Sequence, residues 1–191
     1  MQHSMQRAGR GFGTKNLRTG THWIFGCLLA IVALTSLAAE RDPGAFFDQT
    51  FGDFSEELET ARAEGKQGLL LMFEMDECPF CQRMKTTVLN QPEVQDFFGE
   101  HFLVFPVDIE GDIEVVDFEG NPTTQKDFAL QQFRVRATPV FAFFDLDGNL
   151  VARYTGATRD AEEFMQLGRY VTEGAYEETT FTKYKREQPG D

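Results

Sequence analysis

Hydrophobic residues follow a helical period in some segments of the chain and form continuous runs in others. Phe54, Leu58 and Ala61 lie on one helical face and predict a helix over 54–64. The apolar run that follows predicts a buried strand over 69–74. By the same criteria, further helices are predicted from Cys78 onward and over 126–133 and 160–172, and further strands over 102–109, 140–144 and 150–154. Helices that alternate with strands in this way predict an α/β sandwich.

Three segments are less regular. Pro106 interrupts the strand 102–109, which argues for an edge position or a bulge because proline has no N–H to donate. The acidic segment 110–124 contains two glycines and a proline and predicts a long loop, with a short hairpin through residues 115–116 as an option. The sequence Asp-Leu-Asp-Gly-Asn at 145–149 predicts the turn of a hairpin between two strands.

The N-terminal region has a different pattern. Residues 1–22 contain four basic residues and no acidic residue, and residues 23–39 form an apolar stretch without charge. This is the layout of a secretory signal peptide, and the small residues at its end indicate cleavage after Ala38 or Ala39. The stretch is at the short limit of a membrane span, so an uncleaved anchor is the alternative. The expected parts are a signal peptide or anchor at 1–39, a folded domain at 40–178 and a loose polar tail at 179–191.

The charge of the chain restricts its partners. It has 31 acidic and 18 basic residues and a formal net charge of −13, and four of the basic residues lie in the predicted signal. Such a surface repels nucleic acid and anionic lipid. We therefore expect no nucleic-acid partner, and no membrane contact except through an N-terminal anchor. The acidic residues of 110–119 form either a solvated loop or a docking surface for a basic partner.

The candidate chemistry is a Cys-x-x-Cys motif. Directly after the strand 69–74, at the start of a predicted helix, come Cys78, Pro79, Phe80 and Cys81. Unpaired N–H groups and partial positive charge at a helix start stabilise a thiolate, so Cys78 is the expected attacking thiol. Pro79 suits the first helical position. Cys81, one turn along, attacks the mixed disulfide and releases the substrate. This redox-active disulfide needs no cofactor, and Phe80 is expected to be exposed and to touch substrate.

Two other roles for the cysteine pair stay open. One is a structural disulfide, although a bridge that closes so short a loop stabilises little. The other is Cu(I) handling, with Met75 or Met84 as a soft third ligand. Stoichiometric Cu(I) binding that survives a chelator, without turnover of disulfides, would distinguish it. Zinc is not expected, because two thiolates and one distant histidine leave a tetrahedral site incomplete.

The order of these motifs resembles the thioredoxin superfamily over roughly residues 45–173. The cysteine motif follows a strand, and Ala137-Thr138-Pro139 precedes another strand and a hairpin, with Gly156 and a closing helix behind them. The resemblance implies a thioredoxin-like fold, in which helices flank a central mixed sheet on both faces. It also implies a cis peptide bond before Pro139 and a backbone at Thr138 that pairs with the substrate chain. The alternative is a proline that merely starts a strand.

Within the superfamily, the chain is most similar to exported thioredoxin-like proteins encoded with sulfur-oxidation systems. The similarity lies in the Met-Phe-Glu end of the strand and in the Cys-Pro-aromatic-Cys motif. It implies a periplasmic or otherwise exported thiol–disulfide oxidoreductase, a reductase or interchange protein recharged by a membrane thiol relay. The expected substrates are disulfides of envelope proteins, such as those of sulfur oxidation or cytochrome maturation. A disulfide oxidant or isomerase is the alternative.

Two positions depart from thioredoxin. The tryptophan that precedes the first cysteine in the family is Glu77 here, next to Asp76, and both charges oppose a thiolate. A less acidic thiol favours a reductant, whereas Pro-Phe between the cysteines resembles glutaredoxins and isomerases.

The family's buried aspartate, six residues before the first cysteine, is Met72 here. Glu74 points to the same side of the strand, and we hypothesise that it transfers the proton to and from Cys81, directly or through water. The alternative is a solvated carboxylate at the strand end.

Overall fold

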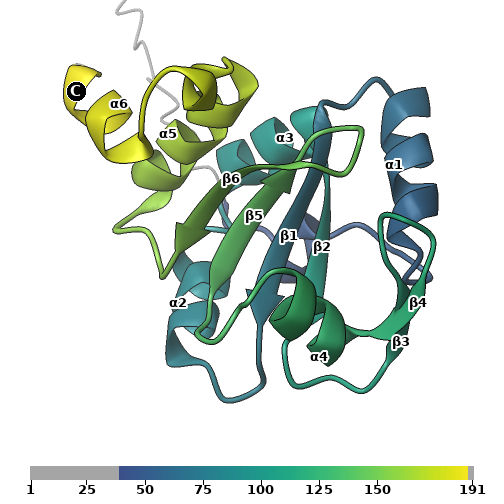
Figure 1. Ribbon diagram of the computed structural model, residues 1–191. Coiled ribbons are helices and arrows are strands. Elements are labelled where there is room, and N and C mark those ends of the chain that lie inside the picture. The colour runs from purple at the N-terminus through teal and green to yellow at the C-terminus, as the bar shows by residue number, and fades with distance from the viewer. Residues whose placement is uncertain (1–38, 189–191) are drawn as a thin grey trace, which may run out of the picture. The chain divides into compact units, whose positions relative to one another are not determined.

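A computed structural model describes residues 39–188 of the chain, and a four-stranded mixed sheet forms the centre of this region (Figure 1). The strands of the sheet are β1 (Gly68–Glu74), β2 (Phe102–Asp108), β5 (Val140–Phe144) and β6 (Leu150–Thr155). A separate hairpin consists of β3 (Glu114–Val116) and β4 (Pro122–Thr124). The order in the sheet is β2-β1-β5-β6, in which β2 is parallel to β1, and β5 is antiparallel to both β1 and β6.

Helices cover both faces of the sheet. The α-helices are α1 (Phe54–Ala63), α2 (Pro79–Thr87), α3 (Pro92–His101), α4 (Gln125–Asp127), α5 (Ala161–Thr172) and α6 (Phe181–Glu187). Shorter turns are the 3-10 helices η1 (Pro43–Phe46) and η3 (Ala175–Glu177) and the π-helical turn η2 (Phe128–Gln132). One face packs against α1 and η2, and the other packs against α2, α3 and α5 (Figure 1). This arrangement confirms the predicted thioredoxin-like fold class.

The side chains of β1 divide between two cores. Leu69, Leu71 and Phe73 pack with the α1 side, whereas Leu70 and Met72 pack with the side that contains both cysteines. All five are fully buried. Because helices cover both faces, the strand is apolar throughout rather than alternating, and this explains the continuous run in the sequence.

The irregular segments follow the sequence expectations in part. Pro106 lies in β2 at the edge of the sheet, as predicted. The segment 110–124, expected as a long loop, contains the optional hairpin, now β3 and β4. Asp117, at the turn of this hairpin, is buried, and its carboxylate accepts hydrogen bonds from the N–H groups of Glu119 and Asn121 and from Gln132 Nε2 at 2.9 Å. The acidic segment is therefore an ordered part of the domain.

The C-terminal segment corrects a prediction. A loose tail was expected from Thr179, but the structure contains α6, which packs on α5. Tyr184 is buried, and its hydroxyl donates to Glu173 Oε2 at 2.8 Å. Lys185 forms an ion pair with Glu163 of α5. A seven-residue helix is not stable alone, so these contacts with α5 hold it.

The predicted signal peptide or anchor at 1–39 lies, apart from Ala39, outside the described residues. Its cleavage and its place in a membrane therefore stay predictions. Between residues 39 and 188, none of the helices has the length and apolar character that a membrane span needs.

The close approach of α3 and α5 depends on Gly168. A Cβ at this position would lie 2.5 Å from Phe97 Cε1 and 2.8 Å from Phe98 Cζ. We expect Gly168→Ala to destabilise the protein by about 1–3 kcal/mol, because overpacking outweighs the gain in helix propensity. Gly99→Ala in α3 is the matched control: no atom lies within 4 Å of its Cβ, and it should stabilise by up to about 1 kcal/mol. Urea unfolding measures both, and equal stabilities would contradict the prediction.

Candidate active site

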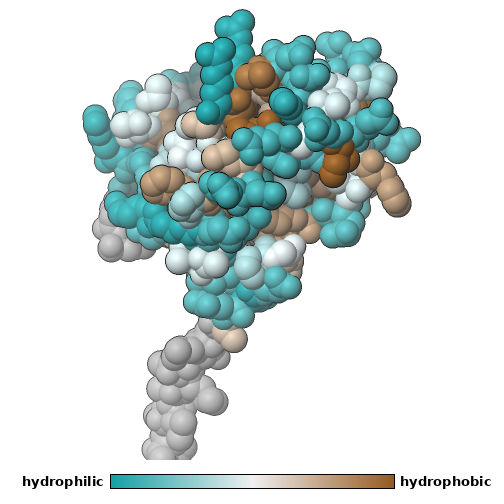
Figure 2. Space-filling model, turned by 90° about the horizontal axis from the view of Figure 1, so that it is seen from below, coloured by the Kyte–Doolittle hydropathy of each residue, from teal (hydrophilic) through white to brown (hydrophobic). Residues whose placement is uncertain are grey.

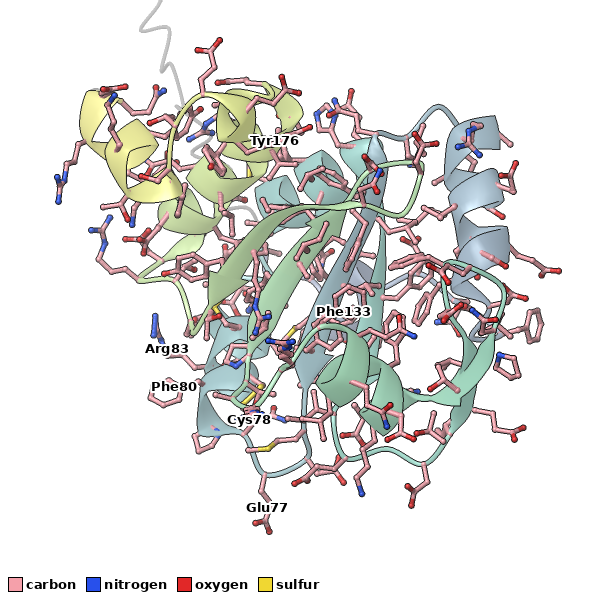
Figure 3. All side chains as sticks on the ribbon, in the orientation of Figure 1. Glu77, Cys78, Phe80, Arg83, Phe133 and Tyr176 are labelled. Atoms are coloured by element: carbon pink, nitrogen blue, oxygen red, sulfur yellow. A yellow bond between two sulfur atoms is a disulfide. The ribbon has the colours of Figure 1, made fainter. Side chains whose placement is uncertain are left out.

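The two cysteines form a disulfide at the N-terminus of α2 (Figure 3). Cys78 is the N-cap residue, and Pro79 occupies the first helical position, as predicted. The Cys81 N–H donates a hydrogen bond to Cys78 Sγ at 3.0 Å. This N–H and the partial positive charge of the helix start both favour a thiolate on Cys78. The geometry therefore supports Cys78 as the attacking thiol.

Exposure differs between the cysteines and their neighbours. Cys78 and Cys81 are 3% and 1% exposed, whereas Phe80 between them is 60% exposed. Figure 3 shows Phe80 and Glu77 pointing outward from the loop and helix that carry Cys78. The face of the molecule seen from below is mostly hydrophilic, with separate hydrophobic side chains (Figure 2). The exposed Phe80 ring thus lies between two buried cysteines, and its contact with substrate stays a prediction.

Thr138 and Pro139 lie at the same end of the sheet as the disulfide. Val140, the next residue, pairs with Phe73 near the end of β1, which leads into the cysteine loop. The Thr138–Pro139 peptide bond is cis, which confirms the prediction. The buried Pro139 carbonyl accepts the N–H of Gly156 at 2.8 Å. Thr138 Oγ1 is shielded from solvent and has no hydrogen-bond partner among the described residues.

Glu74 ends β1 on the disulfide side of the sheet. It continues the face of Leu70 and Met72, whose core cluster contains both cysteines. Its Oε2 lies 2.6 Å from Lys85 Nζ of α2, and the side chains of Glu74 and Lys85 are only 17% and 24% exposed. Glu74 therefore lies on the predicted face and is ion-paired, so a freely solvated carboxylate does not describe it.

A small polar cavity adjoins this ion pair. Its volume is about 80 Å³. It lies between the end of β1, the middle and last turn of α2 and the end of β2, and is lined by Glu74, Met75, Asp76, Gln82, Lys85 and Asp108. Because one water needs about 10–15 Å³ of such volume, the cavity admits water beside the Glu74 carboxylate.

A family model of the thioredoxin-like domain matches residues 54–172. The chain belongs to the thioredoxin-like family. A comparison of this thioredoxin-like protein with curated proteins gives no match. A disulfide with Cys-x-x-Cys spacing in a member of this family supports classification as a thiol–disulfide oxidoreductase.

Two solved structures illustrate the likeness of the thioredoxin-like fold. A thioredoxin-fold protein from Helicobacter pylori is 23% identical with a TM-score of 0.58, and the match covers 75% of this chain and 90% of that one. A DsbH oxidoreductase is 19% identical with a TM-score of 0.52, and the match covers 84% of this chain and 95% of that one. At these identities the likeness concerns the fold. The narrower resemblance to sulfur-oxidation proteins stays a prediction.

The contacts that fix the active-site helix of this thioredoxin-like protein leave no signal in the sequence pattern. Arg83 Nη2 donates to the carbonyls of Thr158 and Arg159, the latter at 2.7 Å. The Thr158 hydroxyl lies 3.6 Å from Met84 Sδ. These contacts hold α2 against the loop between β6 and α5.

Lys85 was also not predicted as part of the site. Its spacing from Cys81 nevertheless places a charge on the inward stripe of the helix, where a partner is required.

Proposed function

We propose that the protein is an exported thiol–disulfide oxidoreductase that acts as a reductase or interchange protein on disulfides of envelope proteins. The observation that carries this proposal is the Cys78–Cys81 disulfide at the start of α2 in a thioredoxin-like domain. The name of one structural neighbour, DsbH oxidoreductase, is consistent with this activity.

The reaction consists of two exchanges. In the reduced protein, the Cys78 thiolate attacks one sulfur of a substrate disulfide, and the other substrate sulfur leaves as a thiolate and takes up a proton. Cys81 then loses its proton and attacks Cys78 Sγ, which forms the Cys78–Cys81 disulfide and releases the second substrate sulfur. The substrate gains two electrons and two protons, and the protein loses them. A dithiol donor, which we propose is a membrane thiol-reducing relay, restores the reduced protein.

Substrate binding uses backbone and side-chain contacts around the disulfide. The backbone at Thr138, before Pro139, lies at the end of the sheet where β1 leads to the cysteines. In this proposal it pairs with an extended substrate chain as an added strand. The exposed ring of Phe80 supplies an apolar contact. Pairing through the main chain tolerates many sequences, which suits a protein that acts on several disulfides.

Glu74 takes and returns the proton of Cys81 in this mechanism. Its carboxylate is on the disulfide side of β1, and the adjoining cavity admits water. In this proposal such water relays the proton between Glu74 and Cys81. The family's buried aspartate position holds Met72, which is fully buried and has no proton to exchange. Glu74 is therefore the carboxylate that we assign to this step.

Local charge favours electron donation. Asp76 and Glu77 are exposed, and both oppose a thiolate on Cys78. A less acidic thiol is a poorer leaving group, which is a property of reductants.

The proposal of export rests on the pattern of residues 1–39. The proposal of substrates in sulfur oxidation or cytochrome maturation rests on the resemblance to exported thioredoxin-like proteins.

The reduction potential tests this proposal. We expect the full-length protein, with Cys27 replaced by serine so that two cysteines remain, to equilibrate with glutathione at or below about −220 mV. A potential nearer about −120 mV would mark an oxidant or isomerase instead. Alkylation of free thiols followed by mass spectrometry measures the oxidised fraction in each buffer. If no intramolecular disulfide forms in any buffer, the proposed function is wrong, and Cu(I) binding becomes the role to test.

A further inference from the structure

Lys85 lies on the inward face of the active-site helix. The other residues on this face, Cys81, Met84 and Val88, are all buried. Lys85 follows Cys81 by one helical turn, so the two side chains are neighbours along the helix surface. A charge on such a face needs a partner. Its amine finds this partner in Glu74, 2.6 Å away at the end of β1.

The surroundings make Glu74 the partner of Lys85. The Lys85 amine lies 5.7 Å from the centroid of the Phe47 ring, which restricts it on one side. Asp108 of β2 lies opposite Glu74 in the strand register, but its own carboxylate accepts the Glu110 N–H at 3.0 Å. Asp76, from the loop after β1, lines the same cavity and is exposed. Lys85 is thus the cation beside the three carboxylates that line this cavity, those of Glu74, Asp76 and Asp108.

We propose that Lys85 is a positioning residue for the second exchange. It holds the Glu74 carboxylate against α2, where that carboxylate accepts the proton of Cys81. The Cys81 sulfur then bonds to Cys78 Sγ, the bond between Cys78 and the substrate sulfur breaks, and the substrate leaves as a thiolate. Lys85 itself neither gains nor loses a proton. The inference rests on the proposed function, and without Lys85 the carboxylate lacks the contact that fixes it beside the helix.

The reagent 5,5′-dithiobis(2-nitrobenzoate) separates the two exchanges. With the reduced full-length Cys27→Ser protein in slight excess, the first thionitrobenzoate released reports attack by Cys78, and the second reports attack by Cys81. We expect Glu74→Gln to slow the second release about a hundredfold, the low end of what a positioned base contributes, and Lys85→Met to slow it by part of that factor. The first release should keep its rate in both variants. Lys85→Arg retains a cation and is expected to restore the second release.

Two further measurements distinguish positioning from a structural effect. In the wild type, the rate of the second release should depend only weakly on pH. The Glu74 carboxylate accepts the Cys81 proton even at low pH, where hydroxide is scarce. Both Lys85→Met and Glu74→Gln should make this dependence steeper, and the double variant should be no slower than Glu74→Gln. Lys183→Met, which breaks an exposed ion pair with Glu187 on α6, is the matched control and should change neither release.

The outcomes separate this inference from the proposed function. If Lys85→Met keeps the wild-type second release while Glu74→Gln slows it, Lys85 does not position Glu74, and the inference alone is wrong. If neither variant changes the second release, the proton-transfer role of Glu74 and the inference are both wrong. If the wild type releases no second equivalent, the two cysteines are not an exchange pair, and the proposed function itself is wrong.

Discussion

Replacement of Cys81 by alanine is expected to abolish turnover of disulfide substrates and to leave each substrate attached to Cys78. Cys78 keeps its place at the start of α2 and still attacks, but the sulfur that resolves the mixed disulfide is gone. A positioned group acts at an effective concentration of about 10⁵ M or more, so an external thiol is a poor replacement and turnover should fall at least about a thousandfold. Insulin reduction measures turnover, and non-reducing electrophoresis with mass spectrometry identifies the trapped substrates.

The matched control for this experiment is Cys78→Ala. It should lose turnover to the same extent but trap no substrate, because the backbone N–H of α2 points at the sulfur of Cys78. Substrate trapped on Cys81 would reverse the assignment of the two thiols. Cys27→Ser, in the predicted signal, should leave turnover and trapping as they are in the wild type.

Much of the fold is predictable because the helices and strands that form it bury a locally patterned face. Phe54, Leu58 and Ala61 recur at helical spacing, and all three are buried in α1. The run that became β1 is apolar on both faces because helices cover both sides of the sheet. Asp160 caps α5 and accepts the Glu163 N–H, so the start of that helix is also a local property.

The remaining parts depend on contacts between distant residues. The β3–β4 hairpin has strands of only three residues, and Asp117 ties its turn to Gln132. The α6 helix contains few apolar residues, and its order comes from α5 rather than from its own propensity. The alternation along β1 places Glu74 on the correct face, but only the packing of α2 shows that Lys85 is its partner. The local sequence pattern therefore predicts the reacting residues, but it does not predict residues such as Lys85 that hold them in position.

Removal of residues 179–191 is expected to destabilise the domain by about 3–5 kcal/mol, because α6 contributes both burial and hydrogen bonds. Tyr184 is buried, and burial together with its hydrogen bond to Glu173 raises the pKa of Tyr184 to about 12. The deletion also removes the Thr179 carbonyl, which accepts the Tyr170 hydroxyl at 2.7 Å. Urea unfolding of the full-length and truncated chains, followed by circular dichroism, measures the difference. Equal stability at pH 7 would show that α6 is not part of the folded domain.

The pH dependence of the stability lost on removal of residues 179–191 shows how much of that stability comes from the Glu163–Lys185 ion pair. Burial acts to raise the pKa of Glu163, but hydrogen bonds from Lys185 and from the Arg159 N–H outweigh it and hold the pKa below its ordinary value. A group with a lowered pKa stabilises the folded state above its unfolded pKa of about 4.3, and this contribution disappears as the pH falls through the folded value. The stability gap between the two chains should therefore be larger at pH 7 than below about pH 4. Lys185→Met, which keeps α6, should show the same pH dependence, whereas the exposed Lys183→Met should change stability by less than about 0.5 kcal/mol at either pH.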